Sequence, residues 1–210
     1  MLQQEAVSSE MINLIRELQS NSLFKDHFLA GGAALALQLG HRTSADIDFF
    51  TSKKQNVELL TEHFKNNYGN TIVNITDKEF IRIYVNNIKV EMFYYEEKLL
   101  KKPKNEKKIR LFSLNDIAVM KLKAITGRTD ARDFIDIAYL LKEIPIVKMF
   151  KQYKKKYGTI DQLNMKETLL IKSKTIKDNE WLVGIKMLRN DIIPQDIPKF
   201  IEKKLGDYKI

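Results

Sequence analysis

The chain contains no cysteine among its 210 residues, which excludes disulfide bonds and thiolate metal sites. Only three histidines occur, and His27, His41 and His63 are too scattered to favour a zinc cluster. No stretch approaches the roughly 18 consecutive apolar residues of a membrane-spanning helix, and the N-terminus lacks the basic-then-apolar pattern of a signal peptide. With 44% apolar residues to fill a core, we expect a cytoplasmic, soluble protein without a membrane partner.

The charge is distributed unevenly along the chain. Residues 1–97 carry 9 Lys and Arg against 13 Asp and Glu, whereas residues 98–210 carry 27 against 14. Lysines crowd together within 98–110 and again within 154–156. Such runs attract a phosphate backbone through the release of counterions, although a merely solvated basic face has the same composition. The second half is therefore the candidate surface for RNA or another polyanion.

The hydrophobic periodicity predicts an α+β first half. Apolar residues at helical spacing indicate an amphipathic helix over 9–20. Strands are expected near 28–30 and 47–50, and alternating residues within 81–94 indicate a hairpin. The hairpin turns at Asn86-Asn87, because asparagine tolerates the positive φ of a two-residue turn.

Two further helical regions are expected outside these elements. Ser52 followed three residues later by Gln55 is typical of a capping box, which predicts a helix from there to about Asn66. The second half is predicted to be helical throughout, with interruptions at its glycines and prolines. The expected organisation is therefore one domain over 1–112 and a helical bundle over 113–210.

A diglycine is the first element of the most informative motif. Gly31-Gly32 lets the backbone approach phosphates closely, because no Cβ intervenes and positive φ costs little. The Ala/Leu run that follows favours a helix, whose N-terminal N–H groups would face those phosphates. Taken alone, a diglycine is more often an ordinary turn.

Two carboxylates complete this motif, separated from the diglycine by thirteen residues. Asp46 and Asp48 are two positions apart on a predicted strand and therefore point to one face. Paired carboxylates suit Mg²⁺, and two such ions would activate an attacking hydroxyl and neutralise a leaving pyrophosphate. An Asp-x-Asp pair alone is commonly a solvated strand face. Its combination with the diglycine and the intervening apolar helix indicates nucleotidyl transfer.

The same residues resemble a known family. The diglycine and the Asp-x-Asp pair resemble the G-[GS]…D-x-D signature of the DNA polymerase β-like nucleotidyltransferase superfamily. More narrowly, the chain resembles the AbiEii/AbiGii toxin family in two runs, Gly31-Gly32-x-Ala34-Leu35-x-Leu37 and His41-Arg42-x-Ser44-x-Asp46-x-Asp48-Phe49-Phe50. The resemblance implies a mixed or antiparallel sheet flanked by helices, Asp46 and Asp48 as metal ligands, and Gly31, Gly32 and Ser44 as nucleotide ligands.

A third acidic group is implied by the resemblance, on a strand next to the Asp-x-Asp strand. Glu91 is the only carboxylate within 88–94, and it alternates with the apolar Val90 and Met92. It is therefore the candidate for a third catalytic and metal-binding carboxylate. The family more usually has Asp at this position, and the alternative is an exposed strand glutamate.

The second informative block is a predicted helix pair within 113–141. Ser113 is expected to begin the first helix, Gly127 to end it, and Asp130 to begin the second. Lys121 falls at the margin of the apolar stripe on the first helix. It is either a lysine whose stem packs along apolar surface or one aimed at a phosphate.

This block resembles the downstream motif of the same family, K-x-x-A-x-x-x-R-x-x-x-R-D-x-x-D. The matching residues are Lys121, Ala124, Arg128, Arg132, Asp133 and Asp136. By that resemblance Lys121 and Arg128 contact the triphosphate, and Asp133 orients one of these cations or assists the acceptor hydroxyl. Asp136 is expected to be a buried partner of Arg132.

The sequence thus predicts a Mg²⁺-dependent nucleotidyltransferase that moves an NMP from an NTP to an acceptor. The resemblance suggests an RNA or tRNA acceptor and a toxin–antitoxin or phage-defence setting with a cognate antitoxin. The expected catalytic residues are Asp46, Asp48, Glu91, Lys121 and Asp133. Two alternatives stay open: a catalytically silent module that binds RNA or protein, and an enzyme that nucleotidylates a protein or a small molecule.

Overall fold

The structure, a computed structural model, describes residues 1–75, 79–158 and 162–206. The chain forms two compact units: the first comprises Met1–Glu97 and Lys102–Phe112, and the second comprises Lys98–Lys101 and Ser113–Ile210. The predicted division lay between residues 112 and 113, where the chain also passes from one unit to the other. Residues 98–101 differ, because they pack with the second unit. Whether each unit folds independently stays a prediction.

The first unit is built on a mixed seven-stranded sheet in the order β3-β4-β5-β2-β1-β7-β6. Its strands are β1 (Phe28–Leu29), β2 (Asp46–Thr51), β3 (Thr71–Ile75), β4 (Phe80–Val85), β5 (Ile88–Tyr94), β6 (Lys104–Glu106) and β7 (Ile109–Leu111). The β2–β5 and β1–β7 pairs are parallel and the other pairs are antiparallel. The predicted α+β class with a mixed sheet is confirmed.

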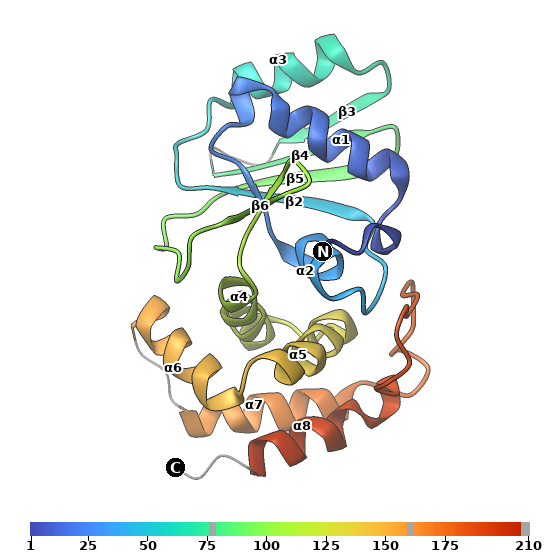
Figure 1. The fold of residues 1–210 in the computed structure, drawn as a ribbon, viewed down its shortest axis with the longest axis vertical. Helices are drawn as coiled ribbons and strands as arrows, with labels where there is room; N and C mark the ends of the chain where they lie inside the picture. The colour runs from blue at the N-terminus through green and yellow to red at the C-terminus, as the bar shows by residue number, and fades with distance from the viewer. Residues whose placement is uncertain (76–78, 159–161, 207–210) are drawn as a thin grey trace. The chain divides into compact units, whose positions relative to one another are not determined.

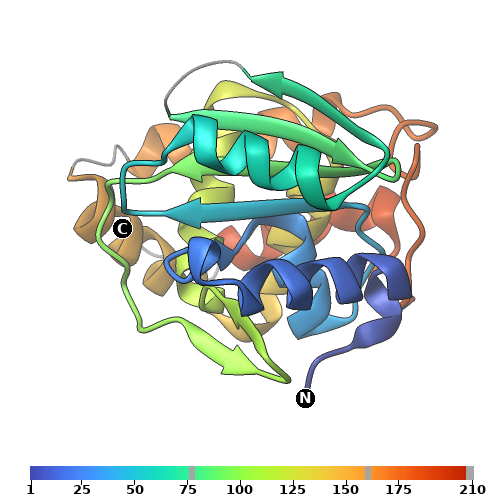
Figure 2. The same ribbon diagram turned by 90° about the horizontal axis from the view of Figure 1, so that it is seen from above.

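Helices cover both faces of this sheet (Figures 1 and 2). The helices α1 (Ser9–Ser20) and α3 (Val57–Asn67) lie on one face, and α2 (Gly31–Leu39) lies on the other. The side chains of β2 alternate accordingly, with every second residue fully or almost fully buried. This alternation sends the two aspartates of β2 to the face that α2 covers.

The face covered by α1 and α3 holds an aromatic core. Phe24 is fully buried, and its ring centroid lies 6.5 Å from that of Phe49 on β2 and 5.8 Å from that of Phe64 on α3. His27 packs against the same cluster, 5.4 Å from the Phe24 ring. Aromatic burial of this kind fixes β2 between its neighbours.

Two local predictions for this unit are confirmed. The helix α1 spans the predicted residues, and the Ser8 hydroxyl caps it by accepting a bond from the Met11 N–H. The hairpin between β4 and β5 turns at Asn86 and Asn87, whose φ values are 48° and 67°. Short polar side chains thus set both features, as expected from local chemistry.

The predicted capping box at Ser52 is wrong. Strand β2 continues to Thr51, whose hydroxyl accepts a hydrogen bond from the Lys53 N–H and closes a turn there. The helix α3 begins later, at Val57, and the Asn56 side chain caps it by accepting a bond from the Leu59 N–H at 3.0 Å. The residues around Ser52 therefore form the turn that ends the strand, and they do not cap a helix.

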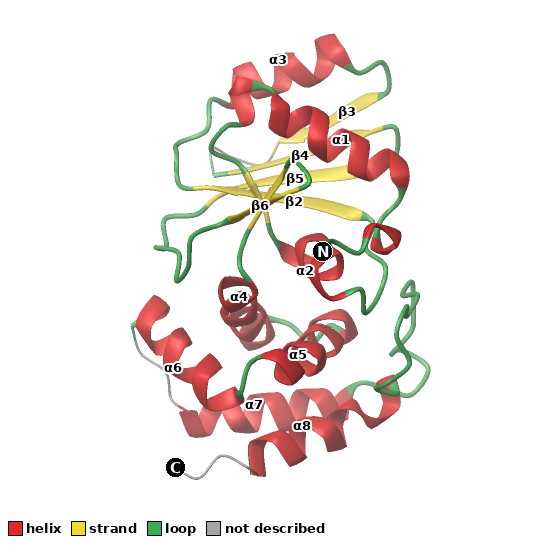
Figure 3. Cartoon of the chain, in the orientation of Figure 1, coloured by secondary structure: helices red, strands yellow, loops and turns green. Residues whose placement is uncertain are grey.

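The second unit is helical (Figure 3). Its helices are α4 (Leu114–Gly127), α5 (Ala131–Glu143), α6 (Ile146–Tyr157), α7 (Gln162–Thr175) and α8 (Ile197–Gly206). Ser113 caps α4 and Asp130 caps α5, each by accepting a backbone N–H bond. The predicted C-terminal helices and their two start signals are confirmed.

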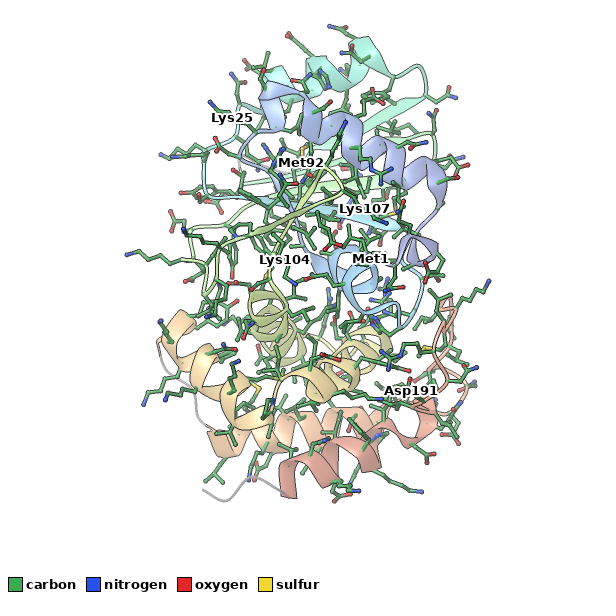
Figure 4. All side chains as sticks on the ribbon, in the orientation of Figure 1. Met1, Lys25, Met92, Lys104, Lys107 and Asp191 are labelled. Carbon is green, nitrogen blue, oxygen red and sulfur yellow. The ribbon has the colours of Figure 1, made fainter. Side chains whose placement is uncertain are left out.

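The segment that joins α7 to α8 is tied to α5 by Asp191 (labelled in Figure 4). The Asp191 carboxylate accepts a bond of 2.9 Å from the Tyr139 hydroxyl and one of 2.6 Å from Arg189, and it also pairs with Lys142. Burial raises the pKa of Asp191, but these hydrogen bonds outweigh it and hold that pKa well below its usual range.

None of the helices described for either unit is long and apolar enough to cross a membrane.

Candidate functional site

The diglycine opens helix α2, as the motif predicts. Gly31 is the first residue of the helix and has a φ of +61°, and the preceding Ala30 supplies no side-chain cap. The Ala/Leu run behind it is buried and forms the body of the helix. An N-terminus without a side-chain cap keeps its positive end available, which suits a phosphate group.

Both glycines lie close to neighbouring side chains. A Cβ on Gly31 would lie 2.1 Å from Oδ2 of Asp48, well inside contact distance. A Cβ on Gly32 would lie 2.8 Å from an Arg42 guanidinium nitrogen and 3.3 Å from the Ser44 hydroxyl. The structure therefore brings together Gly31, Gly32, Ser44 and Asp48, four residues that the sequence nominated.

Arg42 also belongs to this group, although the sequence did not predict it as a site residue. Its side chain is buried, with 4% exposure, and one guanidinium nitrogen donates to the Thr43 carbonyl at 2.9 Å. The available signal was its position inside the same motif, two residues before Ser44. A buried guanidinium beside a helix N-terminus adds positive charge where phosphate is expected.

The acidic residues come from the adjacent parallel strands β2 and β5. Asp48 pairs in register with Glu91, and Asp46 pairs with Lys89 two residues earlier. Because residues two apart on a strand share a face, all four side chains belong to one face of the sheet. The Glu91 side chain is only 10% exposed, so the alternative of an exposed strand glutamate is wrong.

Two cations hold these carboxylates. Lys89 Nζ lies 3.1 Å from Oδ2 of Asp46 and 3.4 Å from Oε2 of Glu91, so it bridges the two strands. Arg82, opposite Glu91 on β4, places its Nη2 and Nε 2.6 and 2.7 Å from Oε1 of Glu91. The sequence did not predict either cation at the site. Their positions beside the carboxylates depend on the register between strands, which the sequence motifs do not contain.

The electrostatics keep both cations charged at neutral pH. Burial lowers the pKa of Lys89, but its hydrogen bond to Asp46 and the charges of Asp46, Glu91 and Asp48 outweigh burial and raise it. The hydrogen bond to Glu91, followed by its charge, raises the pKa of Arg82. Three carboxylates therefore face two permanent positive charges.

The donor set fits Mg²⁺ by its chemistry, although the carboxylates are not gathered into a cage. Hard oxygen atoms from three carboxylates on one partly open face are the ligands that Mg²⁺ prefers. Within 1–75, 79–158 and 162–206, however, no group of three or more His, Asp or Glu side chains is placed to hold a metal ion. The site already holds a cation, the Lys89 ammonium. Magnesium binding stays a prediction.

A cavity of about 760 Å³ lies in the first unit, away from the acidic residues. It is lined by α1 residues such as Asn13 and by the hairpin turn at Asn86, and it reaches Ser44. None of the three acidic residues lines it. The acidic face is therefore identified as the candidate site by its contact with the diglycine and by its three carboxylates, and not by a cavity.

The remaining nominated residues meet in the second unit. Lys121 Nζ donates to Oδ1 of Asp133 at 2.8 Å and lies 2.6 Å from Oδ2 of Asp136. Arg128 grips the Asp133 carboxylate with two nitrogens, at 2.7 and 3.1 Å. Both carboxylates are fully buried. The structure thus brings Lys121 and Arg128 together on the carboxylate of Asp133.

The expected partner of Asp136 is corrected by this geometry. Arg132, on the exposed side of α5, binds the Asp130 carboxylate at 2.7 Å. Asp136 instead contacts Lys121, because it lies one turn beyond Asp133 on the buried face. The hydrogen bond to Asp133 raises the pKa of Arg128, whose side chain is 59% exposed.

The basic second half exposes lysines along α6. Lys148, Lys151, Lys154 and Lys155 are exposed, and the first, second and fourth of these recur at helical spacing. Tyr153, flanked by these lysines, is buried with 5% exposure. The helix therefore offers a charged surface for a polyanion, and the binding of RNA to it stays a prediction.

Comparison with known proteins identifies the family. The family model described as "Nucleotidyl transferase AbiEii toxin, Type IV TA system" matches residues 14–203. An uncharacterised protein of Aquifex aeolicus is 26% identical over 209 residues, which cover 96% of this chain and 97% of that protein. The resemblance seen in the sequence motifs is thereby confirmed.

Two solved structures share the fold. A candidate nucleotidyltransferase of H. pylori superposes with a TM-score of 0.56 at 19% identity, over 95% of this chain and 94% of that one. MenT4, a nucleotidyltransferase toxin of Mycobacterium tuberculosis, gives 0.57 at 14% identity, over 95% and 83%. The chain belongs to the AbiEii family of nucleotidyltransferase toxins, whose common activity is nucleotidyl transfer.

Proposed function

We propose that this protein transfers a nucleoside monophosphate from an NTP to an RNA acceptor in a Mg²⁺-dependent reaction. The observation that carries the proposal is the contact between the diglycine and the acidic strand. It places a helix N-terminus, suited to phosphate, against a carboxylate, suited to a metal ion. Nucleotidyl transfer needs both functions at the same phosphate group.

The first unit would hold the nucleotide and the metal. Gly31, Gly32 and Ser44 are proposed to bind the triphosphate at the start of α2. Asp46, Asp48 and Glu91 would hold one or two Mg²⁺ ions. Bound Mg²⁺ neutralises phosphate charge and makes an attacking hydroxyl more acidic. The carboxylates orient the reacting groups in line, so positioning and charge neutralisation account for the catalysis.

The second unit carries two further candidate nucleotide-binding cations. The family resemblance assigns Lys121 and Arg128 to this role, and Asp133 is bonded to both at distances of 2.7–2.8 Å. Asp133 is therefore proposed to fix the direction of the two cations. Because its carboxylate is fully buried, it keeps its place when the lysine or arginine rotates.

An RNA end is proposed as the acceptor, on the basis of charge. The exposed lysines of α6 offer a surface to which a phosphate backbone binds through counterion release. The family description refers to type IV toxin–antitoxin systems. We therefore propose that the protein acts as the toxin of such a pair, with a cognate antitoxin, in a setting such as phage defence.

The test uses the full chain with Mg²⁺, each labelled NTP in turn, and total tRNA. Asp48→Asn is expected to lower label transfer at least about 100-fold, because metal-assisted charge neutralisation contributes several kcal/mol. Glu58→Gln, which alters an exposed carboxylate at the start of α3, is the matched control and should transfer label like the wild type. Equal transfer by Asp48→Asn and wild type would remove the carboxylate from the mechanism.

A catalytically silent nucleotide-binding module is the second candidate. This candidate is favoured by the ion pairs on the acidic face, where Lys89 and Arg82 bind carboxylates that would otherwise be open to a metal ion. Tight binding of NTP with no label transfer to tRNA, protein or small hydroxyl compounds would select this candidate. Transfer to a protein or small molecule, with RNA affinity that hardly changes with salt, would instead replace the proposed acceptor.

A further inference from the structure

Lys89 occupies a position that the nucleotidyl-transfer reaction alone does not explain. It stands opposite Asp46 in the parallel β2–β5 pair and two residues before Glu91, on the same face. Its ammonium group contacts an oxygen of each carboxylate, at 3.1 and 3.4 Å. A single side chain of this protein thus joins two of the three carboxylates proposed to bind metal.

An ammonium and a divalent cation cannot both occupy this place. Mg²⁺ binds carboxylate oxygens at about 2.0–2.1 Å. An ion bound to the same two oxygens that Lys89 contacts would lie close to its ammonium, and the two positive charges would repel each other strongly on this partly buried face. Metal binding there requires Lys89 to leave at least one carboxylate.

The lysine is able to move, whereas the neighbouring arginine is held by geometry. Lys89 bears its charge at the end of a flexible stem and contacts each carboxylate through a single nitrogen. Arg82 binds Oε1 of Glu91 with two nitrogens, and Lys89 contacts Oε2 of the same carboxylate. Arg82 therefore orients the glutamate, while Lys89 occupies the oxygens between the strands.

We propose that Lys89 is an internal competitor of the divalent cation at Asp46 and Glu91, an inference that rests on the proposed metal-dependent function. The lysine keeps the affinity for the free metal ion low. With an NTP bound as well, phosphate oxygens would supply further ligands for the metal ion, and the Lys89 ammonium would leave the carboxylates. The freed ammonium would then be able to pair with a phosphate oxygen.

The first experiment measures binding of Mn²⁺ to the full chain by calorimetry, without nucleotide. Lys89→Gln is expected to bind Mn²⁺ at least about tenfold more tightly than the wild type, because the competing charge is removed. Lys89→Arg keeps a positive charge and should bind as weakly as the wild type. Lys53→Gln, an exposed lysine that follows β2, controls for the change in net charge and should not alter the affinity.

The outcomes separate this inference from the proposed function. If Asp48→Asn loses Mn²⁺ binding while Lys89→Gln binds no more tightly than the wild type, the competitor role is overturned and the metal site stands. If no variant and no wild-type sample binds Mn²⁺, even with a non-hydrolysable NTP, the metal-dependent function and the competitor role both fail.

A second measurement covers the case in which Lys89→Gln does not fold. A crystal structure of the wild-type chain with Mg²⁺ and a non-hydrolysable NTP should show the Lys89 ammonium withdrawn from Asp46, Glu91 or both. An ammonium that still bridges both carboxylates beside a bound metal ion would overturn the proposal.

Discussion

Asp48 lies so close to Gly31 that its carboxylate oxygen would be 2.1 Å from a Cβ at that position. The contact links the second aspartate of β2 to the first residue of α2. The proposed metal-binding and phosphate-binding parts of the site therefore touch each other at this point. A change at Gly31 is therefore expected to disturb the Asp48 carboxylate as well.

Gly31→Ala is therefore expected to damage both stability and activity. The residue has a φ of +61°, which costs an alanine about 1–2 kcal/mol, and the added methyl group would also displace the Asp48 carboxylate. Urea unfolding should show the lower free energy of unfolding, and label transfer should fall together with it. Gly69→Ala, where nothing lies within 4 Å of the added Cβ, is the control. Equal stability of the two variants would contradict the argument.

Asp136→Ala is expected to destabilise the protein by about 2–4 kcal/mol. The substitution removes one of two buried carboxylates around Lys121 and leaves the lysine in a cluster with excess positive charge. Chemical denaturation measures the loss. Glu143→Ala, at the exposed end of the same helix, should change stability by less than about 0.5 kcal/mol. A stability equal to the wild type would show that Asp133 alone satisfies Lys121.

His27 is expected to make stability depend on pH. Burial lowers its pKa, against a smaller opposing effect of its contact with Gln55 at 3.4 Å. Below about pH 6.5 the unfolded chain therefore takes up a proton more readily than the folded one, and stability falls as the pH falls. Each unit of pKa depression contributes up to about 1.4 kcal/mol of this loss.

The measurement compares wild type and His27→Gln by urea unfolding at pH 7.5 and pH 5.5. The variant should lose less stability between these two pH values. His63 also has a pKa lowered by burial, but it is present in both proteins and its effect cancels. The same loss in both proteins would show that other groups account for the pH dependence.

The α6 lysines are expected to dominate RNA affinity. Changing Lys148, Lys151 and Lys155 together to glutamine should weaken tRNA binding and reduce the slope of log affinity against log salt by about 2, at roughly 0.7 per lost contact. Filter binding between 50 and about 200 mM salt gives the slope. Glutamine at Lys25, Lys53 and Lys54, three exposed lysines of the first unit, removes the same charge and should leave the slope nearly unchanged.

Features set by neighbouring residues were predictable from the sequence. Ser113 and Asp130 begin their helices because their oxygens accept backbone N–H bonds within the first turn. The Asn86-Asn87 turn follows from the positive φ that asparagine tolerates. The start of α3 was misplaced, since the length of strand β2 depends on its pairing partners as well as on local sequence.

The sequence motifs predicted the acidic site residues, but they did not predict the cations that pair with them. Asp46 and Asp48 share a face because of strand geometry, which the sequence contains. That Lys89 stands opposite Asp46, and Arg82 opposite Glu91, depends on the register of three strands. The likeness to a family supplied roles for residues but no information on these counterions.

The short strap at residues 98–101 sets a limit on how this protein can be dissected. The Leu100 and Lys101 N–H groups donate to the buried Asp116 carboxylate, and the Lys98 carbonyl accepts a bond from Lys156. A helical fragment cut at residue 113 would lack this strap and leave two buried charges short of partners. A helical fragment expressed separately should therefore include residues 98–101, for example by circular permutation or by adding the peptide in trans.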